Sequence, residues 1–242
     1  MINERPKFEA ICFDCDSTLT RIEGIDELAR RCGVAAEIAP LTDAAMEGRL
    51  SLEDVYARRL EIVRPGRDAL TWLGERYVEE MVDGAQETIA ALQGIGKPVY
   101  LVSGGFVQSV LMLARAIGIP SSRVRAVEIY LDGSGRYAGF DATSPLIRSD
   151  GKAEICRRLD EQHGAVAIVG DGVTDLAARA SGAYVVGFGG VVRRQVMAGG
   201  ADDFVAEAPL TRTLDALLSA SELGEARRAV ESGQREQDLK GD

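Results

Sequence analysis

Residues 9–18 of this 242-residue chain read EAICFDCDST, a short apolar run that leads directly into two carboxylates. The apolar half has the length and composition of a buried strand. Asp14 and Asp16 are two residues apart, so in an extended segment their side chains point to the same side. At the carboxyl end of a parallel strand they would face the crevice in which open α/β sheets bind ligands. Taken alone, the pair is slightly better explained as an ordinary polar loop.

Four more short apolar runs follow along the chain, separated by stretches with the apolar spacing of helices. Strands that alternate with helices are typical of parallel sheets covered on both faces. The sequence therefore predicts an α/β fold with a Rossmann-like, doubly wound parallel sheet. The expected strands are residues 9–13, 98–102, 165–169, 183–186 and, as the weakest pattern, 203–206.

About eighty residues lie between the first two expected strands, which is many more than one crossover helix needs. The excess predicts a small helical cap, inserted into the core at residues 24–83. Residues 25–32 and 52–63 each place apolar side chains on one face of a helix. Helices with one apolar stripe must pack against another part of the protein.

A second insertion is expected at residues 124–140, where apolar and polar residues alternate around a DGSG turn at 132–135. This pattern predicts a β-hairpin flap. Residues 221–242 are polar and charged, and predict a frayed helix or a tail. The core would then comprise residues 1–23 and 84–220.

The net charge of −10 works against nucleic acid and anionic membranes as partners, because binding to either needs clustered Lys and Arg. The chain has no run of about 18 apolar residues that could span a bilayer. Its first eight residues lack the apolar stretch of a secretory signal. A cytoplasmic protein is expected, with monomer and homodimer both left open.

The cysteines and the single histidine exclude several classes of site. Cys12 and Cys15 form one C-x-x-C at a strand end, without a second pair, so a metal or redox role is not expected. His163 precedes a glycine at the end of an expected helix, where a favourable cation or a cap is the simpler interpretation. Zinc sites built from several histidines are excluded. No G-x-S-x-G motif accompanies a Ser-His-Asp triad.

A second acidic group follows the third expected strand, where residues 170–175 read GDGVTD. Asp171 and Asp175 would meet Asp14 and Asp16 at the same edge of the sheet. Carboxylates that converge repel one another unless a cation lies between them. An all-oxygen site of this kind suits Mg²⁺, as a structural or a catalytic ion.

Two further segments could hold an anion at this edge. Ser103 ends the second expected strand and is followed by Gly104 and Gly105, so a hydroxyl and backbone N–H groups precede a helix. Lys152 comes just before an expected helix at 153–162, where a positive charge is slightly unfavourable to the helix dipole. Ser-Gly-Gly is common at helix starts, and such a lysine is usually inert. The unfavourable placement nevertheless favours a function for Lys152.

Together and in this order, the four segments resemble the haloacid dehalogenase superfamily of phosphatases, whose pattern is D-x-D-x-T, then Ser, then Lys, then G-D-G-x-x-D. The resemblance implies a Rossmann-like core, dependence on Mg²⁺ and a phosphoaspartyl intermediate. A carboxylate that attacks phosphorus splits one difficult displacement into two easier ones. By the same resemblance, Asp14 would be the nucleophile, and Asp16 would be the acid for the leaving oxygen and then the base for water.

The resemblance also implies a metal and phosphate set. Mg²⁺ would be bound by Asp14, the backbone carbonyl of Asp16 and Asp171, with Asp175 orienting these ligands. The phosphoryl oxygens would be held by Ser103, Gly104 and Lys152.

Residues 8–204 resemble the phosphoserine phosphatases in particular, through stretches such as FDCDSTLTRIEGIDELARRCGV, LVSGGF, VGDGVTD and VGFGGVVRRQV. In that family a Glu binds the substrate ammonium and an Arg binds its carboxylate; the matching positions are Glu23 and Arg59. Independently, Arg59 lies about two helical turns after Leu52, on the apolar stripe, while Arg58 points away. A guanidinium on an apolar face needs a partner, unless it snorkels or pairs with an internal acid.

The resemblance places Met46 and Thr174 in the same pocket, and it has two departures. The usual Ala-Asn near the start of the flap is Ala126-Val127, and Thr174 stands where many members have Asn. The implied reaction is hydrolysis of L-phosphoserine to L-serine and phosphate, the last step of serine biosynthesis. The alternatives are a phosphatase or phosphotransferase for another small phosphorylated metabolite, and an inactive binding protein of the same fold.

Overall fold

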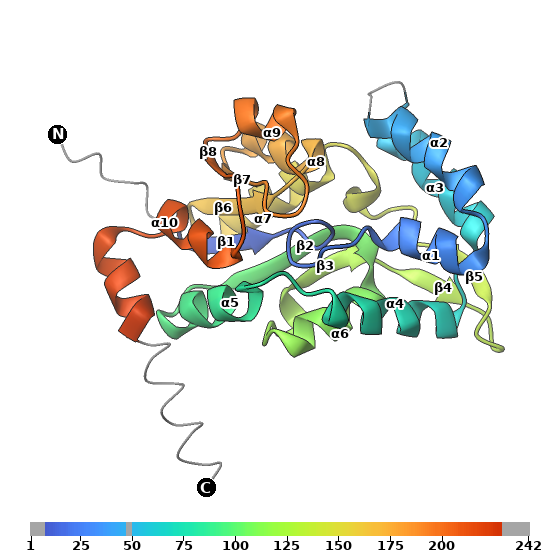
Figure 1. Ribbon diagram of the computed structural model, residues 1–242, viewed down its shortest axis with the longest axis horizontal. Helices are drawn as coiled ribbons and strands as arrows, with labels where there is room; N and C mark the ends of the chain where they lie inside the picture. The colour runs from blue at the N-terminus through green and yellow to red at the C-terminus, as the bar shows by residue number, and fades with distance from the viewer. Residues whose placement is uncertain (1–7, 47–49, 229–242) are drawn as a thin grey trace, which may run out of the picture.

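A parallel sheet forms the centre of the molecule. The computed structural model describes residues 8–46 and 50–228. Within them, a six-stranded sheet has the order β3-β2-β1-β6-β7-β8, and helices cover both of its faces (Figure 1). The strands are β1 (Ala10–Phe13), β2 (Val99–Phe106), β3 (Val124–Val127), β6 (Val166–Gly170), β7 (Tyr184–Phe188) and β8 (Asp203–Val205).

The central position of β1 follows from its composition. Ile11 and Phe13 are fully buried, as is Val169 of the neighbouring β6, because a strand covered on both faces reads as a continuous apolar run. The chain leaves β1 toward β2 on one side, and β6 follows on the other. The residues after β1 therefore lie at the switch point of the sheet, where this class of fold binds ligands.

Five of the six strands are those that the apolar runs predicted, and the sixth is a correction. Residues 124–127, expected to open the hairpin, instead pair with β2 at the edge of the parallel sheet. Val127 is fully buried there. A hairpin arm and an edge strand share the same alternating pattern, so the sequence did not separate them. Ala126 and Val127, which stand where the family usually has Ala-Asn, therefore lie in the sheet and not in the flap.

The predicted helical insert is present and contains α1 (Gly24–Cys32), α2 (Ala35–Met46), α3 (Leu52–Val63) and α4 (Arg67–Glu79). Its two connections to the core lie side by side, because Val82 N donates to Leu19 O at 3.0 Å and Arg21 N donates to Glu80 O at 2.8 Å. Only α4 lies along α6 (Val107–Ala116) beneath the sheet (Figure 1). The boundaries at 24 and 83 stay a prediction.

The predicted flap is also present, as an antiparallel hairpin of β4 (Ile129–Leu131) and β5 (Tyr137–Phe140). The carboxylate of Asp132 accepts hydrogen bonds from the backbone N–H groups of Ser134 and Arg136 and so stabilises the turn. The flap contacts the helical insert, where the rings of Tyr56 and Phe140 lie 5.5 Å apart.

The remaining helices complete the two layers around the sheet. They are α5 (Ala85–Gly94), α6, α7 (Gly151–His163), α8 (Val173–Leu176), α9 (Gln195–Gly200) and α10 (Leu214–Leu217). His163 ends α7 as expected, and its ring bonds the Tyr100 hydroxyl at 2.8 Å. In the part of the chain that the structure describes, no helix has the length and apolar character needed to cross a membrane.

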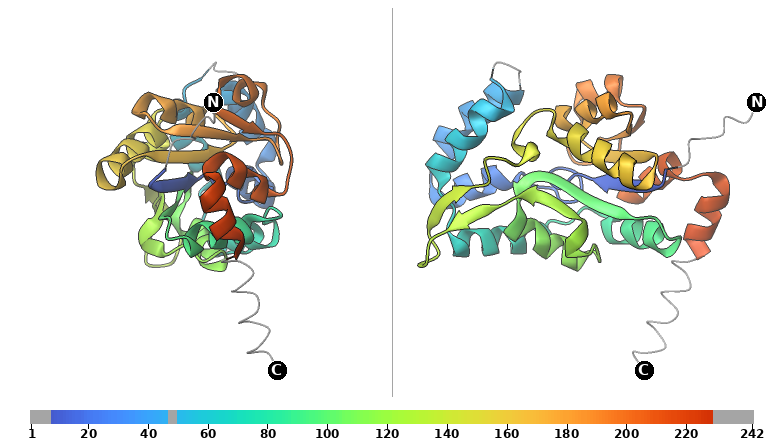
Figure 2. Two further views of the ribbon diagram at one scale, coloured as in Figure 1. Left: turned by 90° about the vertical axis from the view of Figure 1, so that its left-hand side faces the viewer. Right: turned by 180° about the vertical axis from the view of Figure 1, so that it is seen from behind.

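The C-terminal segment, for which a frayed helix or a tail was expected, contains a helix. Residues 220–228 form a helix at the end of the molecule opposite to the helical insert, beside α5 (Figure 2). Ala226 is buried, and Glu222 pairs with Lys97 at 2.7 Å. One small apolar residue and one charge pair give little sequence signal, so the sequence did not separate a helix from a tail here. Residues 229–242 lie outside the described part of the chain.

Candidate active site

The loop after β1 turns sharply and exposes its carboxylates to a cavity. Asp14 N donates to Val169 O at 2.9 Å and extends the pairing of β1 with β6. Ser17 then takes a left-handed backbone with φ of 53°, a strained conformation that is often found at functional sites. The Ser17 hydroxyl donates to Glu23 Oε1 at 2.7 Å. The turn thus holds Glu23 close to the end of β1.

Three carboxylates and one lysine meet at the carboxyl ends of β1 and β6. Asp14, Asp171 and Asp175 are all buried, and each offers an oxygen within 4.8 Å of the other two. Lys152 Nζ lies 2.7 Å from Asp14 Oδ1 and 2.7 Å from Asp175 Oδ1. The sheet therefore brings together four residues that the sequence singled out from three separate segments.

Lys152 reaches this position because α7 begins very close to another loop. A Cβ on Gly151 would lie 1.9 Å from Pro145 O, so only glycine fits at the first position of this helix. Lys152 is in the first turn and buried, with 5% of its surface exposed. The unfavourable helix-dipole placement noted in the sequence is offset here by two carboxylates.

The cluster of Asp14, Asp171 and Asp175 has the ligand chemistry of a magnesium site. Three buried negative groups share one lysine, and all the available ligand atoms are oxygens, which suits Mg²⁺. The side chain of Asp16 is not a member of this group. Its Oδ2 accepts from Gly24 N at 2.9 Å, while its Oδ1 has no hydrogen-bond partner among the described residues. The backbone carbonyl of Asp16 stays a predicted metal ligand.

Burial dominates the electrostatics of the site. It raises the pKa of Asp14, against the opposing effect of Lys152. It also raises the pKa of Asp16, which the Gly24 N–H opposes. The pKa of Asp171 rises to about 6 through burial and the nearby Asp175. Burial lowers the pKa of Lys152, but Asp14 and Asp175 outweigh this and raise it, so the lysine keeps its proton.

Ser103 and Gly104 line the same cavity, although not at a helix start as expected. β2 continues through Phe106, and α6 begins only at Val107. The pairing of β2 with β3 shifts register between Val102 and Phe106, so Ser103 and Gly104 stand in an irregular part of the strand. Irregularities of this kind often redirect side chains next to active sites.

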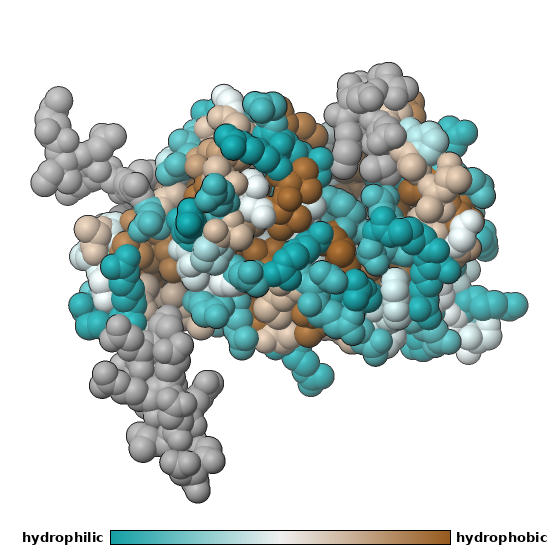
Figure 3. Space-filling view, viewed as in Figure 1, coloured by the Kyte–Doolittle hydropathy of each residue, from teal (hydrophilic) through white to brown (hydrophobic). Residues whose placement is uncertain are grey.

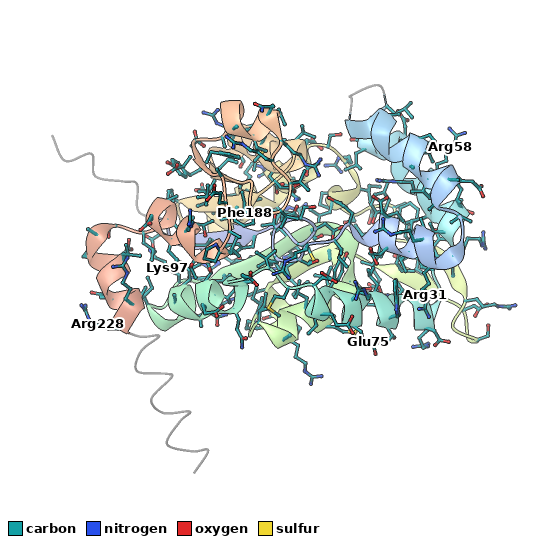
Figure 4. All side chains as sticks on the ribbon, in the orientation of Figure 1. Arg31, Arg58, Glu75, Lys97, Phe188 and Arg228 are labelled. Carbon is teal, nitrogen blue, oxygen red and sulfur yellow. The ribbon has the colours of Figure 1, made fainter. Side chains whose placement is uncertain are left out.

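The cavity has a volume of about 840 Å³ and is lined from both the core and the helical insert. Figure 3 shows the surface hollowed between the α8–α9 side of the core and the insert. Arg59 lines it from α3, and its buried Nε has no hydrogen-bond partner among the described residues. Burial lowers the pKa of Arg59. Arg58 instead projects outward from the insert, as the helical spacing predicted (Figure 4).

Glu23 faces Arg194, a residue to which the sequence assigned no role. Arg194 Nε lies 2.8 Å from Asp171 Oδ2, and its Nη2 lies 3.3 Å from Glu23 Oε1. Burial and the Asp16 charge raise the pKa of Glu23 to about 7, against the effects of Ser17 and Arg194. Arg194 lies in the stretch GFGGVVRRQV, which is one of the segments that resemble the phosphoserine phosphatases, and this was the available signal.

Two tyrosines in the cavity were also missed. Tyr56 and Tyr77 lie on apolar stripes and are nearly fully buried, but each carries a hydroxyl into the site. A tyrosine on an apolar stripe usually seeks a polar partner, which was the usable signal. Thr174 lines the cavity as predicted. Met46 ends α2, and its side chain lies outside the described part of the structure.

Comparisons with known proteins identify the family. Residues 8–182 match the family of haloacid dehalogenase-like hydrolases. Phosphoserine phosphatase of Mus musculus is 39% identical over 191 residues, which cover 78% of this chain and 85% of the mouse protein. The phosphoserine phosphatase of Methanocaldococcus jannaschii is 30% identical over 177 residues, 71% of this chain and 81% of that protein.

Solved structures agree with these sequence matches. A substrate-bound phosphoserine phosphatase complex superposes with a TM-score of 0.74 at 26% identity, covering 88% of this chain and all of the other. A phosphoserine phosphatase structure with a phospho-aspartyl intermediate analogue gives a TM-score of 0.71 at 26% identity, with the same coverage. The chain therefore belongs to the phosphoserine phosphatases of the haloacid dehalogenase superfamily.

Proposed function

We propose that the protein hydrolyses L-phosphoserine to L-serine and phosphate, with Mg²⁺ bound and Asp14 as the covalent nucleophile. The main observation behind the proposal is that one cavity is lined both by the lysine–aspartate cluster of the core and by an arginine of the helical insert. Lys152 joins Asp14 and Asp175 at the sheet, and Arg59 lines the same cavity from α3 with a buried Nε that has no hydrogen-bond partner among the described residues. The family relationship supports this reading.

In the first step, an oxygen of Asp14 attacks phosphorus, and the bond from phosphorus to the serine oxygen breaks. Lys152 is fixed 2.7 Å from Asp14 Oδ1 and stabilises both the ionised nucleophile and the charge on the phosphoryl group. The similar solved structure with a phospho-aspartyl intermediate analogue supports a covalent route.

Asp16 supplies and removes the proton. Burial raises its pKa, so its carboxyl holds a proton more readily than an exposed Asp does. Its Oδ1, which has no hydrogen-bond partner within the described part of the chain, would donate that proton to the leaving serine oxygen. In the second step the ionised Asp16 takes a proton from water, which attacks phosphorus and releases Asp14. The Gly24 N–H holds the other oxygen of Asp16 throughout.

A bound Mg²⁺ would be held by Asp14, the backbone carbonyl of Asp16 and Asp171, and would offset negative charge on the transferring group. Asp175 would orient these ligands, and its own carboxylate is held by Lys152 Nζ at 2.7 Å and Gly172 N at 3.1 Å.

Recognition of the amino acid part would fall to Arg59 and Glu23. Arg59 would pair with the substrate carboxylate and Glu23 with its ammonium, and both contacts are remote from phosphorus. Ser17 and Arg194 hold Glu23 in place from two sides.

The test is phosphate release by the purified protein across small phosphorylated metabolites, including L-phosphoserine. We expect L-phosphoserine to give the highest kcat/KM, EDTA to stop the reaction and added Mg²⁺ to restore it. Release from a different phosphomonoester but not from phosphoserine would support the alternative substrate. Transfer to an added alcohol in place of water would indicate a phosphotransferase, and full activity after exhaustive chelation would contradict the metal assignment.

A further inference from the structure

The hydroxyl of Tyr56 connects the helical insert to the strand that lines the phosphoryl side of the cavity. It donates to the backbone carbonyl oxygen of Gly104 at 2.8 Å. Tyr56 is 7% exposed, and its ring packs against Phe140 of the flap at 5.5 Å. Because the ring is buried and packed against Phe140, the direction of the hydroxyl is fixed, and its hydrogen bond to Gly104 is part of the folded structure.

The Gly104–Gly105 peptide group is held at both of its polar atoms. Its carbonyl oxygen accepts from Tyr56, and its N–H donates to Ser103 Oγ at 2.9 Å. Because Ser103 Oγ is the acceptor in that bond, its own hydroxyl proton is left for another acceptor. Ser103 is 2% exposed and lines the cavity, so a ligand bound in the cavity can supply that acceptor.

The sheet itself does little to orient this peptide group. The register of β2 against β3 shifts between Val102 and Phe106, so the regular ladder is interrupted where Ser103 and Gly104 lie. A second bond from the same helix reaches the core nearby, since Glu53 accepts from Ser149 N at 3.1 Å, three residues before Lys152. Helix α3 thus contacts both segments that are expected to bind phosphate.

We propose that Tyr56 is a positioning residue for phosphoryl binding. Its hydroxyl fixes the Gly104–Gly105 peptide group, which in turn holds Ser103 so that the serine hydroxyl donates to a phosphoryl oxygen of the substrate. This inference rests on the proposed phosphatase function but not on phosphoserine as the substrate. Because α3 also carries Arg59, the same bond couples the amino acid side of the cavity to its phosphoryl side.

The test is Tyr56→Phe, which keeps the ring packing and removes only the hydroxyl. Tyr137→Phe is the matched control, because Tyr137 is equally buried in the flap and its hydroxyl has no hydrogen-bond partner among the described residues. For the Mg²⁺-loaded protein we measure kcat and KM on L-phosphoserine and p-nitrophenyl phosphate, and calorimetric binding of inorganic phosphate.

We expect Tyr56→Phe to lower kcat/KM on both substrates and to weaken phosphate binding, each by roughly twofold to tenfold, the range of one net hydrogen bond. Tyr137→Phe should leave all three values unchanged. A lower melting temperature with unaltered kinetics and phosphate binding would show a merely structural bond and overturn the proposal. A loss confined to L-phosphoserine would also overturn it, because Tyr56 would then act on the amino acid side.

The readouts separate this proposal from the proposed function. If the wild type hydrolyses p-nitrophenyl phosphate but not L-phosphoserine, the substrate assignment fails while the effect of Tyr56 is still measured on the aryl phosphate. If the wild type shows no turnover at all, the binding of inorganic phosphate is the one measurement that decides the role of Tyr56.

Discussion

At the residue scale, the proposed substrate specificity depends on Arg59. Its Nε is buried without a hydrogen-bond acceptor among the described residues, and burial lowers its pKa. A guanidinium in such a place is costly unless an anion binds to it. A small substrate with a carboxylate would supply that anion. The buried Nε therefore supports a substrate-binding role for Arg59 more strongly than its position on the apolar stripe of the helix does.

We predict that Arg59→Ala lowers kcat/KM for L-phosphoserine by roughly 10²-fold, the loss expected for a charge-assisted bidentate contact. Hydrolysis of p-nitrophenyl phosphate, which has no carboxylate, should hardly change. Arg58→Ala is the matched control, because Arg58 is on the same helix and exposed. Equal loss on both substrates would make Arg59 structural, and no loss on either would point to another substrate.

The sequence predicted which residues come together at the site where a motif coincided with a side chain in an unfavourable place. The pair Asp14 and Asp16, the GDGVTD segment and Lys152 are short-range patterns, and the sheet brings Asp14, the two aspartates of GDGVTD and Lys152 together as the strand ends predicted. Arg194 was missed because it contacts Asp171 and Glu23 across more than twenty and more than one hundred and seventy residues of chain, respectively. No local pattern marks a contact of that range.

At the scale of elements, Gly24 is the point where α1, α4 and the site meet. Its N–H donates to Asp16 Oδ2 at 2.9 Å, and an added Cβ would lie 2.1 Å from the Tyr77 hydroxyl oxygen of α4. Tyr77 is fully buried and so cannot move away freely. The start of α1 therefore requires glycine for reasons of space.

We predict that Gly24→Ala destabilises the protein by about 1–3 kcal/mol, the range typical of overpacking, and also impairs phosphate release. Urea unfolding measures the first effect and a steady-state assay the second. Adding Tyr77→Phe should recover part of the stability, because the hydroxyl is the closest atom. Gly199→Ala is the control, since a Cβ there meets nothing within 4 Å. Equal stabilities for the two alanine variants would refute the steric explanation.

Strands and helices were predictable to different degrees. Runs buried on both faces, such as β1 and β6, are unambiguous because every residue is apolar. The edge strand β3 was assigned wrongly, and the segment at residues 220–228 was left open as a frayed helix or a tail, since each has only one buried face or a few buried side chains. Their positions depend on which surfaces the rest of the fold leaves open, and the local sequence does not contain that information.

At the scale of the whole molecule, the ion pair of Glu222 with Lys97 connects the C-terminal helix at 220–228 to the core. Lys97 is labelled in Figure 4. Burial alone would raise the pKa of Glu222, but the bonds from Lys97 and Ser219 outweigh it and lower that pKa to about 2. Ionised Glu222 therefore stabilises the folded state at neutral pH. This contribution is lost as the pH falls from about 4.5, the ordinary glutamate pKa, to about 2.

We predict that Glu222→Gln lowers the free energy of unfolding by roughly 1 kcal/mol at pH 7, toward the upper end for a partly exposed pair. The difference from wild type should shrink as the pH is lowered through that window. Urea titrations at several pH values measure it, with Glu225→Gln, an exposed position on the same helix, as the control. A difference that stays constant with pH would exclude the charge as its source.

The proposed function depends on Asp14 as the nucleophile of a phosphoserine phosphatase. The most direct measurement is Mg²⁺-dependent phosphate release from L-phosphoserine by the wild type and by Asp14→Asn, with circular dichroism to verify that the variant is folded. An amide is a poor nucleophile and a weaker metal ligand, so we predict turnover by the wild type and release at assay background by the variant. Near-normal release by folded Asp14→Asn, or no release by the wild type, would contradict the account.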